Sequence, residues 1–431
     1  MMATIMKPYL VSFLLAFLIF VVISPAIQAD LVENFENLYG EAKGEVSEDF
    51  NGVKDEVKSV FNGTRRILRR APYRGPCKAT NPIDRCWRCD PNWAEDRQRL
   101  ADCALGFGRD AIGGKGGRFY VVTDPSDDDV VDPRPGTLRW GVIQPEPLWI
   151  VFARSMVITL KQELIIQSFK TIDGRGFKVR ISGGAGFTIQ NVNNVIIHSL
   201  YIHDIISTNG GTIRDSTTHK GLRMRTDGDG IVVFGSSNIW LDHLSMSKAV
   251  DGLIDVVQGS TNVTISNCHF TDHNKVLLFG ANDNYMPDKG MKVTVAYTHF
   301  GKRLVQRMPR CRLGFFNLVN NDYTHWEMYA IGGSSGAQIL SEGNRFTAQN
   351  AHEETREVTH RASMNENWKS WTWSSVDDEF RRGAFFTTSG NQHPDLTQYN
   401  YGMIQHAPAH MVTEMTMFSG ALGRCRVGRP C

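Results

Sequence analysis

The chain has almost no net charge. Its 431 residues include 47 basic and 45 acidic side chains, which leaves a formal charge of +2. A nucleic-acid-binding protein normally shows a marked excess of Lys and Arg on one face or helix, so the sequence gives no support for that function. With 41% hydrophobic and 21% charged residues, the composition is that of a globular protein and excludes disorder as the main state.

Long hydrophobic runs are absent as well. The longest, residues 10–23, has 14 residues, fewer than the roughly 18 that a membrane-spanning helix needs. Lys7 precedes it and small residues follow near Ala26 and Ala29, which favours a signal peptide over residues 1–29 rather than a membrane anchor. We therefore expect a secreted, extracellular protein that has no membrane contact after cleavage.

Cysteine is scarce, with eight residues in the chain. The single CxxC, Cys86-Trp-Arg-Cys89, has neither a second CxxC nor a nearby His pair, so structural disulfides are favoured over a zinc or redox site. An oxidising compartment agrees with this interpretation, although the spacing leaves the connectivity open. Asn62 and Asn262 each begin a glycosylation acceptor motif, the second inside a strand-like run.

The segment before residue 76 differs from the rest of the chain. Residues 30–64 contain nine acids and three lysines with helical apolar periodicity, and the basic run 65–70 follows directly. This pattern is typical of a solvated amphipathic helix with a charged linker, or of a propeptide cut at the basic run. We expect a charged amphipathic extension or propeptide over residues 30–75 and a separate domain over residues 76–431.

A short β-rich pattern recurs along the main domain. Six copies begin at Ile197, Leu241, Ile265, Val295, Leu318 and Ser341, and the shortest steps between them are 23 or 24 residues. One such repeat cannot bury its apolar face alone, but stacked coils share a continuous core. The sequence therefore predicts an all-β chain, a single-stranded parallel β-helix (β-solenoid) with long loops. A leucine-rich repeat has a similar period but needs a Leu-x-x-Leu-x-Leu signature, which the copies lack. A helix in Cys86–Gly106 is expected to cap an open end of the solenoid.

Acidic residues gather over consecutive coils, at Asp227, Asp229, Asp242, Asp251 and Asp255. Carboxylate oxygens in such number suit a hard cation, above all Ca²⁺. In a strand, Asp227 and Asp229 would share a face, whereas Asp251 and Asp255 need a bend between them to reach one ion. The alternative is that these are turn-forming Asp-Gly pairs.

Basic residues follow these acids, at Lys275, Arg307, Arg310 and Arg312. A cationic set in a chain of nearly neutral charge indicates an acidic substrate, although lone basic residues on loops are usually solvated. Histidines in such positions, including His269, His299 and His325, more often have a packing role than a catalytic one.

Several motifs together resemble the plant pectate lyases of polysaccharide lyase family 1. They are Asn81-Pro-Ile-Asp-Arg-Cys-Trp-Arg-Cys89, Trp240-Leu-Asp-His243, Asp251-Gly-Leu-Ile-Asp255, His273-Asn-Lys275, Gln306-Arg-Met-Pro-Arg-Cys-Arg312 and the long run from Asn320 to Gly333. The resemblance covers most of the main domain, and the charged leading segment is similar to the extension found in some family members.

The resemblance implies a right-handed parallel β-helix, with 76–431 as its catalytic domain, that cleaves de-esterified α-1,4-galacturonan (pectate) by calcium-dependent β-elimination. By the same resemblance, Asp229, Asp251 and Asp255 are the Ca²⁺ ligands with Asp227 a further one, Lys275 and Arg312 bind substrate carboxylates, and Arg307 is the catalytic base. The implied partner is pectate in the plant cell wall, and the protein is expected to be a monomer.

The chain departs from the family pattern at an internal asparagine ladder. Asn321 and Asn344 keep the asparagine, whereas Leu244, Cys268 and Thr298 replace it in three earlier copies. We therefore expect an interrupted ladder and a buried free thiol at Cys268.

Two other functions compete with a lyase. A non-catalytic pectin-binding protein on the same fold is conceivable because Lys248-Ala249 stands where the family commonly has Asn-Cys beside the metal site. A galacturonan hydrolase would need paired acid and base carboxylates, and the Asn-Thr-Asp and Gly-His-Gly elements expected of that family are missing.

Overall fold

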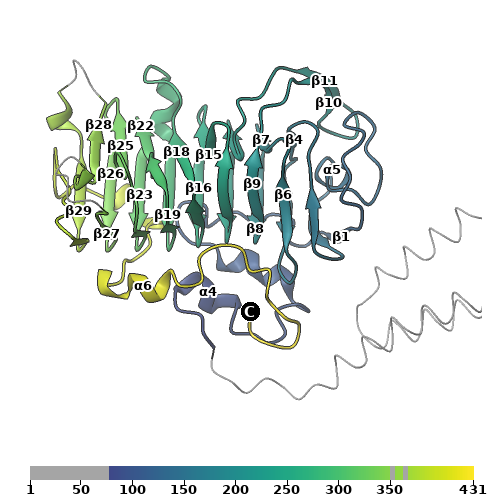
Figure 1. The fold of residues 1–431 in the computed structure, drawn as a ribbon, viewed down its shortest axis with the longest axis horizontal. Helices are drawn as coiled ribbons and strands as arrows, with labels where there is room; N and C mark the ends of the chain where they lie inside the picture. Colours follow the sequence, from purple (N-terminus) through teal and green to yellow (C-terminus); the bar gives the residue numbers. More distant parts are fainter. Residues whose placement is uncertain (1–76, 350–354, 363–366) are drawn as a thin grey trace, which may run out of the picture. The chain divides into compact units, whose positions relative to one another are not determined.

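The computed structural model describes residues 77–349, 355–362 and 367–431 (Figure 1). The signal peptide, the charged extension and the Asn62 motif predicted above lie outside these residues. Among the described residues, no helix is both long enough and apolar enough to cross a membrane.

In the described residues, the main chain winds through three parallel sheets, here named A, B and C. Sheet A consists of β1 (Arg118–Val122), β2 (Leu148–Phe152), β5 (Lys170–Asp173), β8 (Asn193–His198), β13 (Ser237–Asp242), β16 (Thr261–Ser266), β19 (Lys292–Ala296), β23 (Phe315–Val319), β26 (Gln338–Glu342) and β29 (Trp373–Val376). Sheet B consists of β3 (Met156–Ile158), β6 (Val179–Ser182), β9 (Tyr201–Ile205), β14 (Ser245–Ala249), β17 (His269–Thr271), β20 (His299–Phe300), β24 (Asp322–Tyr323), β27 (Arg345–Thr347) and β30 (Glu379–Arg381).

Sheet C carries the residues of interest for function. It consists of β4 (Leu164–Ile165), β7 (Phe187–Gln190), β12 (Ile231–Phe234), β15 (Gly252–Val257), β18 (His273–Phe279), β22 (Arg310–Arg312), β25 (Ile331–Ser334) and β28 (Thr359–Arg361), with β21 (Leu304–Gln306) also paired to β18. A hairpin of β10 (Gly211–Arg214) and β11 (Lys220–Arg223) is inserted between β9 and β12. The predicted parallel β-helix is confirmed.

The six predicted repeat copies pair in register. Ile197, Leu241, Ile265, Val295 and Leu318 are direct partners on neighbouring strands of sheet A, and Leu318 pairs with Ser341 of the last copy. Their alignment in the sequence therefore equals their alignment in space, and longer steps between copies are taken up by loops between strands.

The interior is a single apolar core that runs along the solenoid axis. Part of it is a stack of rings from the last position of successive copies, Phe270, Phe300, Tyr323 and Phe346. Neighbouring ring centroids are 5.5, 4.5 and 4.5 Å apart. Such aromatic pairs add about 0.5–1.5 kcal/mol each beyond the area that they bury. The stack thus stabilises the coils and also helps to set their register.

The asparagine ladder is interrupted as predicted. The Asn344 side-chain oxygen accepts from the backbone N–H of Asn321 at 2.7 Å, and the Asn321 oxygen accepts from the N–H of Thr298 at 2.9 Å. One coil earlier, the Thr298 hydroxyl accepts from the N–H of Cys268 at 3.3 Å, so a hydroxyl extends the ladder by one step. Cys268 is buried and free, as expected, and Leu244 joins the apolar core.

The predicted position of the helical cap was wrong for the segment Cys86–Gly106. This segment, with α4 (Pro82–Trp87) and the 3₁₀ helix η1 (Arg97–Cys103), packs along the outer face of sheet A rather than on an end, where Ile83 and Leu100 share an apolar cluster with Trp240 (Figure 1). An apolar helix face can cover the side of a solenoid as well as its end, and periodicity does not distinguish the two.

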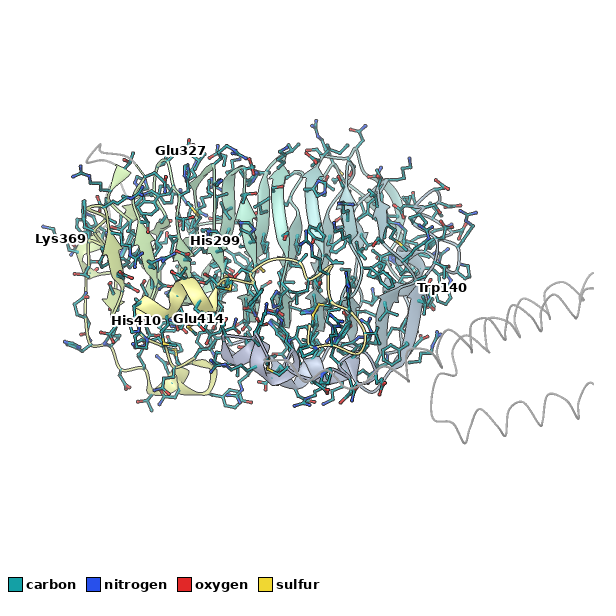
Figure 2. The ribbon with its side chains drawn as sticks, turned by 60° about the horizontal axis from the view of Figure 1, so that its bottom comes forward. Trp140, His299, Glu327, Lys369, His410 and Glu414 are labelled. Atoms are coloured by element: carbon teal, nitrogen blue, oxygen red, sulfur yellow. A yellow bond between two sulfur atoms is a disulfide. The ribbon has the colours of Figure 1, made fainter. Side chains whose placement is uncertain are left out.

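The short helix α5 (Leu138–Val142) lies beside the first strands instead. Thr137 caps it, since its side chain accepts a hydrogen bond from the N–H of Trp140. Leu138 and Val142 enter the core, and the Trp140 ring stacks on the Tyr120 ring with centroids 5.2 Å apart. Figure 2 labels Trp140 among the side chains of this part of the chain. The remaining helices are η2 (Met286–Gly290), η4 (Trp368–Ser370), η5 (Thr397–Gly402), η6 (Ala409–Met411) and α6 (Val412–Met415).

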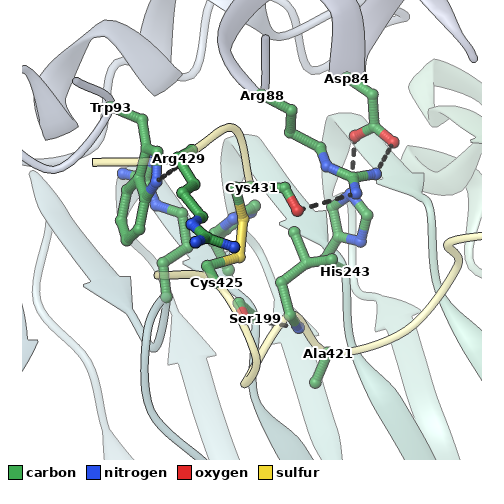
Figure 3. Close-up of a disulfide and its surroundings, with 12 residues drawn as sticks. Asp84, Arg88, Trp93, Ser199, His243, Ala421, Cys425, Arg429 and Cys431 are labelled. Atoms are coloured by element: carbon green, nitrogen blue, oxygen red, sulfur yellow. Dashed lines mark hydrogen bonds and ion pairs between the residues drawn. A yellow bond between two sulfur atoms is a disulfide. The ribbon is translucent and has the colours of Figure 1, made fainter. Parts of the chain in front are cut away.

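Three disulfides join six of the eight cysteines, as the sequence favoured, and Cys268 and Cys311 are free. The disulfides join Cys77 to Cys89, Cys86 to Cys103 and Cys425 to Cys431. The first two fasten the α4 segment, and the third closes the C-terminal segment that lies beside it (Figure 3).

Beneath α4 lies a buried network of charged side chains (Figure 3). Asp84 accepts from the Arg88 guanidinium at 2.5 Å, and its other oxygen lies 2.8 Å from Nε2 of His243. The Nδ1 atom of His243 is 2.9 Å from the carbonyl oxygen of Gly420 in the C-terminal segment. The network therefore ties the helix, the solenoid and the C-terminal segment together.

Candidate active site

The predicted acids and lysine come together on the outer face of sheet C. Asp227 and Asp229 lie just before β12, Asp251 lies just before β15, Asp255 is within β15, and Lys275 is within the neighbouring strand β18. Parallel pairing of the three strands brings together positions that are up to 48 residues apart in sequence, which supports the predicted grouping.

Two carboxylates converge over Gly252. The Asp229 oxygen Oδ1 accepts from the Gly252 N–H at 2.5 Å. A Cβ placed on Gly252 would lie 2.4 Å from Oδ1 of Asp255 and 2.9 Å from Oδ1 of Asp229. A side chain at this position would crowd both carboxylates, so the close approach of Asp229 and Asp255 depends on the glycine.

Asp251 and Asp227 are placed differently. The Lys275 ammonium donates to Oδ1 of Asp251, and the ring of His273 lies 2.7 Å from the backbone oxygen of the same residue. Asp227 is exposed at the edge of the group. Neither Asp227 nor Asp229 lies in a strand, because Gly228 between them has a φ of +97°, so the predicted strand spacing of this pair was wrong.

The four carboxylates repel one another. Burial raises the pKa of Asp229 from 3.8 to about 6, and the charges of Asp251 and Asp227 add to the rise. Burial and the charge of Asp229 raise the pKa of Asp255 well above its ordinary value, against the opposing charge of Arg307. Within the described residues no three His, Cys, Asp or Glu side chains are arranged as a ready-made metal site. The acids are nevertheless hard oxygen donors with too few positive partners.

Arg307 faces these acids from the turn between β21 and β22. Its backbone has a φ of +66°, an unusual value for a residue with a side chain. Its carbonyl accepts from the N–H of Leu277 at 2.7 Å, which holds the turn against β18. The Nε atom of Arg307 is buried and has no hydrogen-bond partner among the described residues. The side chain is thus a half-buried cation whose charge reaches Asp255.

Arg312 already has an acidic partner, which the sequence did not predict. Its Nε donates to Asp283 at 3.0 Å and its Nη1 donates to the Gly280 carbonyl at 2.7 Å. The Ser334 hydroxyl also donates to Asp283, at 2.6 Å. Asp283 lies in the loop between β18 and η2, and sequence spacing gave no signal that this loop returns to sheet C.

Asp242 is not part of the site, although it was grouped with the acids in sequence. It is fully buried on the outer face of sheet A, where its oxygens lie 2.8 Å from His198 and 2.6 Å from the Ser266 hydroxyl. The predicted packing role of the histidines is supported at His269 and His299, whose rings stack at 4.8 Å on sheet B.

Fold and site together define a parallel β-helix with an acidic cluster and facing arginines on one outer face. Residues 159–377 match the family model for pectate lyase. A pectate lyase of Nicotiana tabacum is 61% identical over 378 residues, covering 87% of this chain and 95% of the tobacco protein. A pectate lyase of Lilium longiflorum is 55% identical over 391 residues, covering 90% and 88%. The chain belongs to the pectate lyase family.

Solved structures agree with the fold. The crystal structure of the major allergen from cedar pollen has 44% identity and a TM-score of 0.77, covering 79% of this chain and 99% of that one. A pectate lyase of Bacillus sp. N165, crystallised in complex with trigalacturonate, has 19% identity and a TM-score of 0.53, covering 74% and 99%, and supports the fold alone.

Proposed function

We propose that this chain cleaves de-esterified α-1,4-galacturonan by β-elimination, with its site on the outer face of sheet C. The observation that carries the proposal is the group of crowded carboxylates facing the unpartnered, half-buried Arg307. An acidic polymer bridged by a cation fits this arrangement, because among the described residues only Asp251 of the four acids has a cationic ion-pair partner, and the Arg307 guanidinium makes no hydrogen bond or ion pair.

Ca²⁺ is the cation that the donor set suits. Asp229, Asp255 and Asp251 would hold it, with Asp227 at the open side, and a substrate carboxylate would complete the ligands. Burial raises the pKa of both Asp229 and Asp255, and the charges of the neighbouring carboxylates raise both further, a repulsion that a bound cation would relieve. When bound, the ion neutralises the substrate carboxylate next to C5 and makes the C5 proton more acidic.

The chain's own residues then perform three tasks. Lys275, held against Asp251, binds a uronate carboxylate, and Arg312 contributes a second contact beyond its pair with Asp283. Arg307 accepts the proton from C5. As that proton leaves, the C4–C5 double bond forms and the glycosidic oxygen departs from C4, taking a proton from solvent.

A guanidinium is an unusual base, because it normally keeps its proton. Arg307 is partly buried and lies among other cations: burial, and then the charges of Arg310 and Arg307, lower the pKa of the neighbouring Arg312.

Arg307→Lys tests the assignment. Purified protein with Ca²⁺ and polygalacturonate should produce unsaturated ends that absorb in the ultraviolet, and a chelator should abolish the signal. In the variant, turnover should fall about 10²–10⁴-fold while substrate affinity and melting temperature stay near wild type. Arg303→Lys is the matched control, because Arg303 is exposed and pairs with Asp272.

Two outcomes would overturn the proposal. Near-normal turnover in a stable Arg307→Lys variant would remove Arg307 from the role of base. Calcium-dependent retention of polygalacturonate by the wild type with no unsaturated product would replace the lyase by the non-catalytic binding function.

We also propose that the protein acts outside the cell, in the plant cell wall where its substrate lies. The three disulfides support this, because such bonds persist in oxidising compartments.

A further inference from the structure

We propose that Arg310, together with the stacked rings of Tyr329 and His360, forms a distal subsite that binds a second uronate of the polymer beyond the catalytic arginine. The inference rests on the proposed function and adds a second site at which the protein binds longer substrates. Three observations carry it: a register row, an unpartnered guanidinium and an exposed ring platform.

The register row runs along sheet C from the acidic cluster. Asp255 pairs with Leu278, Leu278 with Arg310, Arg310 with Gly332, and Gly332 with His360. Because neighbouring strands lie about 4.8 Å apart, Arg310 is about 10 Å and His360 about 19 Å from Asp255 along the solenoid axis. A polymer lying along this row would pass the acids first and these residues next.

The row faces outward. The next residues along β15, β18 and β22 are Val256, Phe279 and Cys311, which all belong to the core. Since successive side chains in a strand point to opposite faces, Leu278 and Arg310 lie on the same outer face as Asp255.

Arg310 is a cation without a partner. Among the described residues its guanidinium makes no hydrogen bond or ion pair, and its Nε atom is buried. Its own charge reaches both Arg312 and His360, where it adds to burial in lowering the pKa of each side chain. A buried, unpaired donor is costly, and a carboxylate ligand would relieve that cost. Arg312, in contrast, already has one acidic partner, Asp283.

The rings of Tyr329 and His360 stack beside Arg310, with centroids 4.8 Å apart and planes 15° from parallel. Gly332 makes the arrangement possible, because a Cβ there would lie 2.4 Å from the Tyr329 ring. Tyr329 is only 3% exposed, whereas His360 is exposed and presents its ring to solvent. Burial and the charge of Arg310 lower the pKa of His360, so its neutral ring can pack against the C–H face of a sugar while Arg310 binds the carboxylate.

The test measures KM and kcat for Arg310→Gln and His360→Ala on trigalacturonate, hexagalacturonate and polygalacturonate with saturating Ca²⁺. The loss of affinity should grow with substrate length and reach about tenfold or more on polygalacturonate, with kcat changing less than KM. Arg310→Lys should lose less than Arg310→Gln, because it keeps the charge. Arg303→Gln is the control and should match wild type at every length.

The outcomes separate this inference from the proposed function. If wild type produces no unsaturated ends, the lyase function fails, and direct binding of the three substrates to the calcium-loaded proteins tests the subsite alone. If wild type is active but the Arg310 and His360 variants show the same KM as wild type, or lose equally at all lengths while folded, the distal subsite is overturned.

Discussion

Removing the charge of Asp84 should destabilise the protein strongly while leaving its chemistry intact. Both ring nitrogens of His243 face oxygens: Nε2 faces the Asp84 carboxylate and Nδ1 the carbonyl of Gly420. A histidine that donates at both nitrogens is an imidazolium. Asp84 therefore neutralises two buried cations, His243 and Arg88, and Asp84→Asn removes the only side-chain carboxylate in contact with either among the described residues, leaving His243 with the more distant charge of Asp242.

The magnitude follows from burial. Asp84 and His243 are completely buried. Removing one partner of a buried ion pair costs about 3–5 kcal/mol, whereas an exposed pair is worth about 0–1 kcal/mol. For a domain of this size we expect Asp84→Asn to lower the melting temperature by about 5–10 °C. His243 can limit the loss by giving up its proton, so the cost depends on pH.

The sign of that dependence comes from two opposite pKa shifts. Burial alone would raise the pKa of Asp84, but the charges of His243 and Arg88 hold it below 3.8, so its contribution is present above that pH and is lost on acidification. Burial alone would lower the pKa of His243, but Asp84 raises it above 6.5, so its contribution is complete below 6.5 and is lost as pH rises through the folded value. The difference in melting temperature between wild type and Asp84→Asn should be largest at pH values between the folded-state pKa of Asp84 and that of His243. At alkaline pH the difference should be smaller but not zero, because Arg88 still pairs with Asp84 in the wild type.

Thermal melts of wild type and Asp84→Asn at pH 5 and pH 9 measure the effect. Asp90→Asn is the control, because Asp90 is partly exposed, contacts Arg99 at 3.8 Å, and accepts from the Asn92 N–H at 2.8 Å through an oxygen that asparagine retains. Turnover at 25 °C should be unchanged in both variants, since the network lies on sheet A. A melting temperature for Asp84→Asn within about 2 °C of wild type at pH 5 would refute the reasoning.

Three further outcomes are expected. Gly252→Ala should reduce turnover about 10²-fold or more with circular dichroism unchanged, because its Cβ would lie 2.4 Å from Oδ1 of Asp255; wild-type turnover would contradict the geometry. Asn321→Leu should lose about 3 kcal/mol in urea unfolding, since the side chain makes three buried hydrogen bonds worth about 1 kcal/mol each, and a loss below 1 kcal/mol would show that the ladder is dispensable. The free thiols of Cys268 and Cys311 are buried, which raises the pKa of both, so a thiol reagent should react with them only after unfolding; rapid reaction of the native protein would contradict this placement.

The solenoid was predictable because the side chains that point into its core recur at equivalent positions of each repeat. Positions such as Ile265 and Phe270 recur in each copy, and strand pairing reproduces their alignment residue by residue. The location of the segment Cys86–Gly106 was not predictable in the same way. The apolar face of this segment must pack against some apolar surface of the solenoid. Such surface is available both at the ends and on the sides of the solenoid, so the sequence does not decide between them.

The acids of the site were predictable as a group, since Asp229 and Asp255 lie on neighbouring coils at similar phases. Their closeness depends on Gly252, which sequence reasoning interpreted as a bend rather than as space for two carboxylates. The pairing of Arg312 with Asp283 was not predictable, because it depends on how a loop folds back after β18. Contacts set by strand register can be counted along a sequence, whereas contacts set by loop closure cannot.

The different fates of Asp242 and Asp255 show what separates a structural acid from a functional one. Both lie in strands of neighbouring coils with side chains outside the apolar core. Asp242 is covered by the α4 segment and is satisfied by His198 and Asn267, so its charge has a fixed internal use. Within the part of the chain that the structure describes, the Asp255 carboxylate makes no hydrogen bond or ion pair, and burial together with repulsion from neighbouring carboxylates raises its pKa. A charge that the fold leaves uncompensated must be met by a ligand, so the surface that remains uncovered, more than the acid itself, determines where function resides.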